Sequence, residues 1–356
     1  MSGLLASNPV TADAPPDRLL AARVFREEAD REGFSRFGVA RAADAPRFDR
    51  FERWIDSGLH AGMRYLADTR AARRSPSEIL SGARSVICLA TPHAREPWVA
   101  EDGSRYARYA RGADYHGSLR ERAFRVLAGA RRRLPGAWAS RVCVDSTPIA
   151  ERAFAAAAGL GWIGKNGCLI DASQGSYLLL AEIVTDLDLP PDAPVAEQCG
   201  ACVRCLESCP TGALIAPAVL DADLCIAYWT IEHAGPVPDD RKASIGDHVF
   251  GCDVCQEVCP WNAPLAAAGP LARPVPAPPA RADVLGMGRG AWRRRFGETA
   301  VNRAARRGLQ RNAAISAGAR GDRACLPTLR RAAGIEETGL ADAARWALAR
   351  ISPPPL

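Results

Sequence analysis

The sequence lacks the features that would send this chain into or across a membrane. No stretch approaches the roughly 18–20 consecutive apolar residues that span a bilayer, which argues against a membrane-spanning helix. Residues 1–20 carry no basic segment followed by an apolar core, so they do not predict a secretory signal, and we interpret them as a loose extension. We therefore expect the chain in the cytoplasm, a reducing compartment where the twelve cysteines are not expected to form disulfides and are better explained by metal binding or catalysis.

Lysine is also scarce. Lys165 and Lys242 are the only two, so 44 of the 46 basic residues are arginine, and the net charge is +6. Arginine binds phosphate with two parallel hydrogen bonds and stacks on bases. A GC-rich coding sequence enriches arginine whatever the function, so only local clusters of arginine are informative. Hydrophobic and charged fractions of 48% and 24% are ordinary for a globular protein and exclude a disordered or collagen-like chain.

The 356 residues suggest two or three domains. Apolar periodicity over the first half alternates between helical and strand-like spacing, which predicts a mixed α/β domain over residues 1–189. The expected helices are 17–32, 48–57, 115–133 and 148–159, and the expected strands are 38–40, 85–90, 141–144 and 177–185.

Two proline-rich stretches, 189–198 and 262–281, read as connectors around a cysteine-dense segment. We place a second domain at 190–265, and a linker with a helical, arginine-rich tail at 266–356. The tail reads as short paired helices, loosely similar to HEAT-type repeats. The fold class expected is therefore α+β and multidomain.

The cysteine spacing carries the clearest chemistry. Cys199, Cys202, Cys205 and Cys209 are spaced C-x2-C-x2-C-x3-C and precede Pro210, which is the bacterial ferredoxin pattern. Cys252, Cys255 and Cys259 precede Pro260 and repeat its last three positions, and Cys225 can supply the missing ligand. Eight thiolates are what two [4Fe–4S] clusters require. Two zinc sites are the alternative, but zinc usually takes separated C-x2-C pairs.

The fourth cysteine of such a run crosses to the other cluster in two-cluster ferredoxins. We therefore expect a first cysteine group of Cys199, Cys202, Cys205 and Cys259, and a second cysteine group of Cys209, Cys225, Cys252 and Cys255. The remaining cysteines, Cys88, Cys143, Cys168 and Cys325, lie in apolar segments and read as inert core residues.

Several longer motifs resemble one family. They are VDSTPIAERAFAAAAGLGWIGKNGCLI (144–170), CGACVRCLESCPTGAL (199–214), CIAYWTIE (225–232), GCDVCQEVCPWN (251–262), GLHAGMRYL (58–66), GARSVI (82–87) and ARGADYH (110–116). Together they cover nearly the whole chain and are similar to the epoxyqueuosine reductases. The resemblance implies a cobalamin-dependent iron–sulfur oxidoreductase that removes the epoxide oxygen from epoxyqueuosine at the tRNA wobble position, the last step of queuosine synthesis.

The family fold implied is a cobalamin-binding α/β domain, a ferredoxin-like domain with two clusters and a HEAT-like region that helps to hold tRNA. Asp145 matches the family's acid, and its pKa would have to be raised by burial beside the corrin for that role. It follows strand 141–144, at the carboxyl end where α/β sheets place ligands. The residues alone allow an alternative, in which Asp145 is the N-cap of the next helix.

The resemblance implies further cobalamin contacts. The matched positions are Arg73, Tyr106, Asp145, Leu169, Leu180, Ala227, Cys252 and Asp253. Ala227 departs from the family, where serine is usual, so a hydroxyl contact there is lost or replaced, while a backbone contact would survive. His93 stands where the usual tyrosine motif is absent and reads as a surface or loop residue, and His116 is too weakly marked to be assigned a role.

Arginines in the tail predict contact with tRNA. Trp292 and Phe296 flank Arg293–Arg295, and Arg303, Arg306, Arg307 and Arg311 continue at helical spacing. Such a stripe suits phosphate tracking and base stacking, although a solvated helix face has the same pattern. We also expect an unidentified low-potential electron donor, no membrane partner and a monomer.

Two other functions share part of these features. A corrinoid reductive dehalogenase has the same cofactors, but that family usually carries an export signal and lacks a helical tail. A ferredoxin-type electron carrier would not need about 190 further residues with a buried acid.

Overall fold

The computed structural model describes residues 16–263, 275–336 and 338–352. Residues 1–15 of the expected N-terminal extension and most of the second connector lie outside these residues, whereas residues 18–20, also expected in the extension, begin helix α1. None of the described helices is both long and apolar enough to cross a bilayer.

A four-stranded sheet forms the centre of the N-terminal half. Its order is β1-β2-β8-β5, and every neighbouring pair is antiparallel. The strands are β1 (Arg36–Arg41), β2 (Ser85–Pro92), β8 (Leu178–Thr185) and β5 (Ser140–Cys143). All of β2 is buried, which explains its continuous apolar sequence. Asp145 lies just beyond the end of β5, but the reason given for a ligand there was wrong, because binding at the carboxyl ends of strands is a property of parallel α/β sheets.

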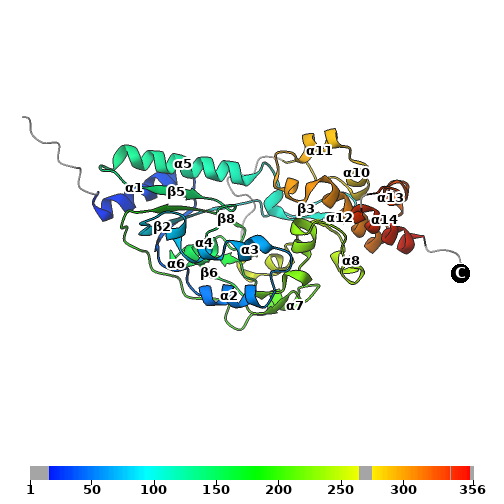
Figure 1. Ribbon diagram of the computed structural model, residues 1–356, viewed down its shortest axis with the longest axis horizontal. Helices are drawn as coiled ribbons and strands as arrows, with labels where there is room; N and C mark the ends of the chain where they lie inside the picture. The colour runs from blue at the N-terminus through cyan, green and yellow to red at the C-terminus, as the bar shows by residue number, and fades with distance from the viewer. Residues whose placement is uncertain (1–15, 264–274, 337, 353–356) are drawn as a thin grey trace, which may run out of the picture.

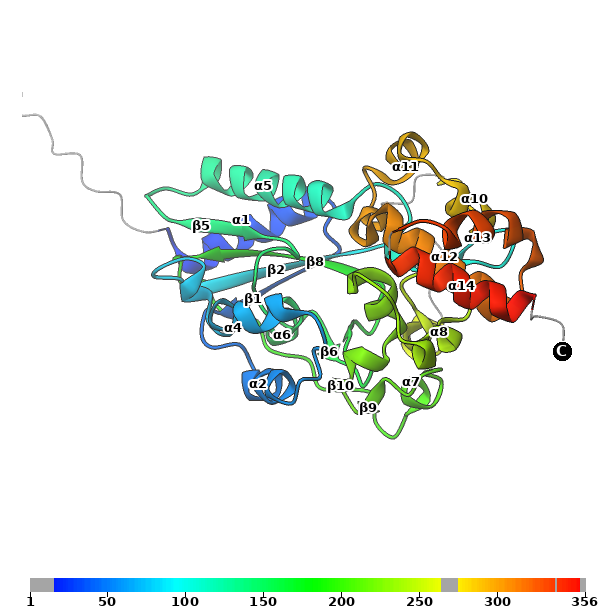
Figure 2. The same ribbon diagram turned by 45° about the vertical axis from the view of Figure 1, so that its right-hand side comes forward.

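Helices cover both faces of this sheet, as Figure 1 shows. Helices α1 (Arg18–Arg31) and α5 (Tyr115–Arg133) pack on one face, and α6 (Glu151–Ala157) packs on the other. Residues of β8 alternate between the two cores, with Leu179, Ala181 and Ile183 facing α1 and α5, and Val184 facing α6. The short helices α2 (Phe48–Asp56), α3 (Arg64–Asp68) and α4 (Arg70–Arg74) lie on the α6 side in both ribbon views (Figures 1 and 2).

The loop between β5 and α6 differs from the expected helix at 148–159. Helix α6 begins three residues later, at Glu151, and its N-cap is Ala150. Asp145 has a φ of 47°, in the left-handed region, and does not cap the helix. The N-cap interpretation of Asp145 is therefore wrong, because the Pro148 that we took as the first helical residue lies in the connecting loop.

The cysteine-dense segment is built from short elements. They are β9 (Leu214–Ala216), β10 (Val219–Leu220), β11 (His248–Phe250), α7 (Arg204–Glu207), α8 (Asp239–Ile245) and α9 (Val254–Glu257), with a π-turn at Tyr228–Glu232. Strand β11 pairs with β4 (Arg105–Tyr106), which in turn pairs with β3 (Trp98–Val99). This small sheet joins the segment to the N-terminal half. Two further strands, β6 (Trp162–Ile163) and β7 (Leu169–Ile170), form a separate hairpin.

The C-terminal helices are α10 (Arg281–Gly286), α11 (Arg289–Phe296), α12 (Ala305–Arg320), α13 (Leu326–Ala333) and α14 (Thr338–Ile351). Figure 2 shows them gathered beside the cysteine-dense segment. Residues of α12 share one hydrophobic core with Trp229 and Phe250 of that segment. The buried Arg311 donates to the carbonyls of Trp229, His233 and Gly235. The tail is therefore integrated with the cysteine-dense segment by a common core.

Candidate active site and cluster sites

The structure brings cysteines of the same expected group near one another, and the assignment of ligands to each cluster stays a prediction. In the first group, burial raises the pKa of Cys205, and the neighbouring Cys199 and Cys259 raise it further. In the second group, burial raises the pKa of Cys252 to about 12, and Cys225 and Cys209 add to that shift. Cys252 and Cys225 likewise add to the burial that raises the pKa of Cys255. All eight thiols are free.

These groups suit iron–sulfur clusters better than zinc. Cys199, Cys202, Cys205 and Cys209 stand in one run of eleven residues, whereas zinc sites usually take two separated C-x2-C pairs. The thiolate chemistry and the two-by-four grouping fit two clusters.

The other cysteines separate into two kinds. Cys88, Cys143 and Cys325 are buried in the core, as expected. Burial raises the pKa of Cys168 to about 11, but the cluster cysteines Cys259 and Cys205 also act on it. Cys168 therefore lies close to the cluster ligands, a position that its sequence context did not indicate.

Asp145 belongs to a group of charged side chains at the end of β5, which we call the acid corner and define as Asp114, His116, Asp145 and Glu151. The imidazole of His116 bridges two carboxylates: Nε2 lies 2.7 Å from Asp145 Oδ2, and Nδ1 lies 2.5 Å from Asp114 Oδ1. Two acceptors hold both ring nitrogens as donors, which is the imidazolium form. The side chain of Asp145 is 51% exposed, so it is accessible to a substrate.

The charge state of the acid corner reverses one expectation. The hydrogen bond to Asp145 raises the pKa of His116 to about 9, despite its partial burial. The same bond lowers the pKa of Asp145, with a further contribution from the Tyr115 hydroxyl. The protein groups alone therefore lower the pKa of Asp145, because a cationic partner outweighs burial, and a rise would have to come from burial beside the corrin. At neutral pH the pair carries one proton, and that proton resides on His116.

Glu151 completes the acid corner at the first turn of α6. Its Oε1 accepts a hydrogen bond of 2.7 Å from the backbone N–H of Asp145. Burial raises the pKa of Glu151 to about 7, and the charge of Asp145 adds to the shift. Sequence reasoning did not single out Glu151, and it left His116 without a role. Both residues fall within the family-like motifs, Glu151 in 144–170 and His116 in 110–116, so the available signal was their membership of those motifs.

An aromatic path connects the acid corner to the second cysteine group. The His116 ring stacks on Tyr115 with centroids 4.1 Å apart, and Tyr115 lies 6.0 Å from Tyr109. Tyr109 in turn lies 6.0 Å from Phe250, two residues before Cys252. Burial raises the pKa of Tyr109, and the carboxylates of Asp145 and Asp253 both add to it. Tyr109 therefore lies between the predicted acid and the second cysteine group.

The residues predicted to contact cobalamin fall into several places. Arg73 is near the acid corner: burial lowers its pKa, and Glu151 and Asp145 oppose that shift. Leu169 is buried against the α6 side of the sheet, where Leu180 packs partly exposed. Ala227 directly precedes the π-turn at Tyr228–Glu232 and is partly buried.

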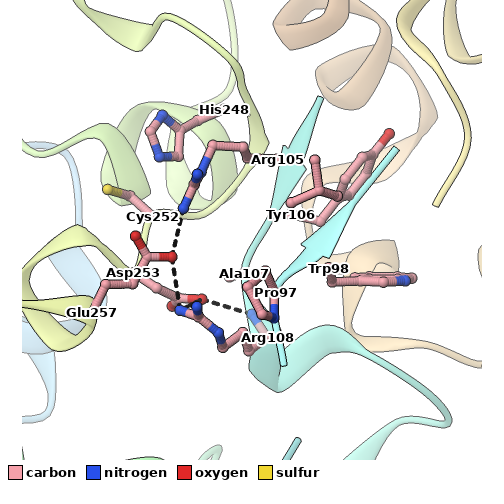
Figure 3. Close-up of a pocket in the computed structure, with 11 residues that line it drawn as sticks. Pro97, Trp98, Arg105, Tyr106, Ala107, Arg108, His248, Cys252, Asp253 and Glu257 are labelled. Atoms are coloured by element: carbon pink, nitrogen blue, oxygen red, sulfur yellow. Dashed lines mark hydrogen bonds and ion pairs between the residues drawn. The ribbon is translucent and has the colours of Figure 1, made fainter. Parts of the chain in front are cut away.

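Tyr106, Cys252 and Asp253 instead line a cavity near the second cysteine group, shown in Figure 3. Asp253 Oδ2 accepts a 2.8 Å hydrogen bond from the backbone N–H of Arg108, and Arg108 also pairs with Glu257 at 2.8 Å. Tyr106 is 3% exposed, and its hydroxyl donates to the carbonyl of Pro279 at 3.0 Å. The hydroxyl of Tyr106 is therefore already occupied by the protein.

His93 lies in the loop after β2, as the sequence suggested, but it is not at the surface. It is 7% exposed, packs against Tyr177 and has its Nδ1 2.9 Å from the carbonyl of Ala94. Burial lowers its pKa to about 4, so it is neutral at physiological pH.

The tail arginines divide by exposure. Arg293, Arg294, Arg303 and Arg307 are exposed, whereas Arg311 is buried in the bonds described above. Trp292 and Phe296 are 9% and 1% exposed, so they pack in the core and are not available to stack on bases. The predicted stripe is therefore a purely cationic surface, because the periodicity that placed the aromatics beside arginine also placed them on the inward face.

Comparisons with known proteins agree with this architecture. Residues 73–146 match the family described as "Epoxyqueuosine reductase QueG, DUF1730", and residues 198–262 match the "4Fe-4S double cluster binding domain". An epoxyqueuosine reductase of Xanthomonas campestris is 43% identical over 256 residues, covering 70% of this chain and 72% of the relative. This chain belongs to the epoxyqueuosine reductase family.

Solved structures of epoxyqueuosine reductases have the same fold. One, in complex with an epoxyqueuosine-modified tRNA-Tyr stem loop, is 27% identical with a TM-score of 0.86, covering 93% of this chain and 90% of that one. Another, from Bacillus subtilis, has its catalytic aspartate loop swung out of the active site, and matches at 27% identity with a TM-score of 0.82, covering 93% and 90%.

Membership of the family makes this chain an oxidoreductase of tRNA modification. It reduces epoxyqueuosine to queuosine, and its cofactors are two [4Fe–4S] clusters and cobalamin. The dehalogenase and electron-carrier alternatives are thereby set aside.

Proposed function

We propose that Asp145 and His116 act together as the general acid that protonates the epoxide oxygen as it leaves epoxyqueuosine. The observation that carries this proposal is the 2.7 Å contact between His116 Nε2 and Asp145 Oδ2 in an accessible pair that holds one proton at neutral pH. An alkoxide is a far stronger base than either group. Transfer of the proton from the imidazolium through Asp145 is therefore downhill once the carbon–oxygen bond breaks.

The backbone conformation of Asp145 suits a loop that changes position. A left-handed φ of 47° at a residue other than glycine costs on the order of 1–3 kcal/mol and tends to occur at functional sites. Two hydrogen bonds hold Asp145 in this conformation. Glu151 accepts one from its backbone N–H, and His116 donates one to its carboxylate. In the related Bacillus subtilis enzyme the catalytic aspartate loop has swung out of the active site. We infer that the loop of Asp145 likewise exchanges between two positions.

The cavity near the second cysteine group is lined by polar atoms that suit the edge of a corrinoid. Buried Arg108 Nε and His248 Nε2 have no hydrogen-bond partner among the described residues, and both side chains line this cavity (Figure 3). Corrinoids carry amides and a phosphate at their edge. Arg108 Nε can donate to their oxygens, and His248 Nε2, whose Nδ1 donates to the carbonyl of Ile245, can accept from an amide N–H. Cys252, Asp253, Ala227, Leu169, Leu180, Arg73, Tyr106 and Asp145 are the residues that we propose hold cobalamin. When bound, cobalamin supplies low-potential electrons, which side chains cannot provide.

The two cysteine groups hold the clusters in the crossed pattern. Cys199, Cys202, Cys205 and Cys259 ligate one cluster, and Cys209, Cys225, Cys252 and Cys255 ligate the other. The second group lies on the aromatic path to the acid corner, which puts its cluster nearer to the substrate. An unidentified low-potential donor reduces the clusters.

The exposed tail arginines form the tRNA surface. Arg303 reaches the site itself: it pairs with Glu232 at 2.7 Å, and its charge acts on Asp145. Arg293, Arg294 and Arg307 extend this charge along the tail. We propose an α/β cobalamin domain at 1–189, a ferredoxin-like domain at 190–265 and a HEAT-like region at 266–356, in a cytoplasmic monomer.

Nucleoside analysis of tRNA tests this function. A strain that lacks the gene should accumulate epoxyqueuosine, and the wild-type gene should restore queuosine. A gene encoding Asp145→Asn should not restore it, although its product should be present at normal levels with both clusters. If the gene encoding Asp145→Asn restored queuosine, Asp145 would not be part of the general acid.

A further inference from the structure

Glu151 is an ionisable side chain that takes no part in the proton transfer from His116 and Asp145 described above. It lies at the start of α6, partly buried, with Oε1 fixed 2.7 Å from the backbone nitrogen of Asp145. That bond uses one carboxyl oxygen as an acceptor and leaves the other free to carry a proton. Glu151 is thus held directly against the residue that delivers a proton to substrate.

The surroundings of Glu151 are mostly acidic or neutral. The titratable and charged groups that face it are Asp145 after β5, Glu182 on β8, Cys88 on β2, Cys143 on β5, Tyr115 on α5, Arg73 on α4 and its neighbour Arg152. Burial raises the pKa of Glu151 to about 7, and the Asp145 charge opposes its ionisation further. This environment keeps a substantial share of Glu151 protonated at neutral pH.

The reaction requires more protons than the Asp145–His116 pair holds. Converting an epoxide to an alkene breaks two carbon–oxygen bonds and releases the oxygen as water, which takes up two electrons and two protons. The electrons come from the redox cofactors of the family. The pair of His116 and Asp145 carries a single proton, so a second donor must recharge it within each turnover.

We propose that Glu151 supplies the second proton, by recharging Asp145 from its place behind the catalytic loop. The inference rests on the proposed role of Asp145 and deepens it. In the balanced step, the first proton passes from His116 through Asp145 to the alkoxide and gives a hydroxyl. The second passes from the free oxygen of Glu151 to Asp145, and from there to the departing hydroxyl, which leaves as water. Glu151 is left as a carboxylate and regains its proton from solvent.

The variant Glu151→Gln separates this role from a structural one. Its amide oxygen can still accept the hydrogen bond from the Asp145 N–H, but the side chain can no longer release a proton to Asp145. Single-turnover conversion of an epoxyqueuosine stem loop by pre-reduced holoenzyme is measured from pH 6 to pH 9. Glu121→Gln is the matched control, because Glu121 is a surface residue of α5 that is 73% exposed.

We expect the ratio of wild-type to Glu151→Gln rate to depend on pH. At pH 6 it should be about 10-fold or more, within the usual contribution of a positioned acid. It should approach one near pH 9, where wild-type Glu151 has itself lost its proton. Glu151→Asp should recover part of the low-pH rate. Infrared spectra should show a protonated carboxyl band that titrates near pH 7 in the wild type and is missing in Glu151→Gln.

A ratio that stays constant across this pH range would mean that Glu151 only holds the loop, and would overturn the proposal. Equal rates for wild type and Glu151→Gln at pH 6 would overturn it as well. The proposed function has a separate readout, since near-normal conversion by Asp145→Asn would overturn the acid role of Asp145, whatever the pH dependence of Glu151→Gln.

Discussion

The cluster ligands and the acid corner are linked by a path of aromatic side chains but are assembled in opposite ways. The eight cluster cysteines come from one segment, 199–259, at spacings that leave little freedom in how they group. The acid corner takes Asp114 and His116 from the start of α5, Asp145 from the loop after β5 and Glu151 from the start of α6. Only the packing of α5 and α6 on opposite faces of one sheet brings these groups together.

This difference decides how each site controls its chemistry. Thiolate ligands need only be present at the right spacing, because the cluster itself organises them. The acid corner has no such template, and the proton affinity of each group there is set by its neighbours. His116 is held as a cation by two carboxylates, and Glu151 is held near neutrality by burial, although both are within bonding distance of Asp145 or its backbone.

The largest effect should come from breaking a cluster. We expect Cys209→Ala to lose the cluster of the second group and Cys199→Ala to lose that of the first, each with about half of the iron and no turnover. Low-temperature electron paramagnetic resonance of each reduced variant identifies the cluster that remains. Cys255→Ala removes another ligand of the same cluster as Cys209→Ala, so the two variants should give the same spectrum. If Cys209→Ala and Cys199→Ala left identical spectra, the crossed pattern would be incorrect.

Substitution in the acid corner should preserve the cofactors and lose the chemistry. Asp145→Asn removes one of the two carboxylates that hold His116 as a cation, and the amide cannot pass a proton to the substrate, so deoxygenation should fall by roughly 10²–10⁴-fold. Single turnover of pre-reduced enzyme measures this directly, with cluster and corrinoid content as controls. Asp145→Ala should also be less stable than Asp145→Asn by roughly 1 kcal/mol, because asparagine tolerates the left-handed backbone better than alanine. Near-normal turnover by Asp145→Asn would exclude the proposed acid.

Most of the fold could be predicted from periodicity and spacing. The helix expected at 115–133 is α5 to the residue, and the buried run that begins at Ser85 is β2. The errors arose where one residue type has two uses. Pro148 is favoured at the start of a helix and equally in a turn, so the sequence placed the start of α6 too early and gave Asp145 the wrong backbone role.

The site was less predictable, because its chemistry depends on long-range neighbours. Sequence alone suggested a buried Asp145 with a raised pKa, whereas His116, 29 residues away in the chain, reverses the direction. Trp292 looked suitable for base stacking until its inward orientation was known. Residue identity was visible in each case, but the partner that fixes its charge or exposure lies on another element.

The tRNA surface should show a smaller, graded effect. Arg303→Ala removes one exposed cation beside the site, so tRNA affinity should fall a few-fold and the slope of log affinity against log salt should flatten by roughly 0.7–1. Titrations of the stem loop across a salt series measure both. Arg18→Ala, an exposed arginine on α1 that pairs with Asp188, is the control and should change neither. An unchanged slope for Arg303→Ala would remove this residue from the interface.

The smallest effect on activity is expected at Glu182, which sharpens the comparison by testing a carboxyl with no cationic partner. Glu182 is fully buried on β8, and neither of its carboxyl oxygens has a hydrogen-bond partner among the described residues. Burial raises its pKa well above the usual range, and Glu151 and Asp145 add to the shift.

This shift makes the stability of the protein depend on pH. A carboxyl whose pKa is raised in the native state stabilises the fold below its pKa in the unfolded chain, near 4.5, and this stabilisation is lost as pH rises towards the native pKa. Glu182→Gln cannot ionise, so its advantage over wild type in unfolding free energy should grow by up to about 1.4 kcal/mol per pH unit above pH 4.5. Urea unfolding of both proteins from pH 5 to pH 8 measures this slope, while turnover at pH 7 stays near wild type. Parallel stability curves would show that Glu182 is ionised in the native state, with a partner that offsets its burial.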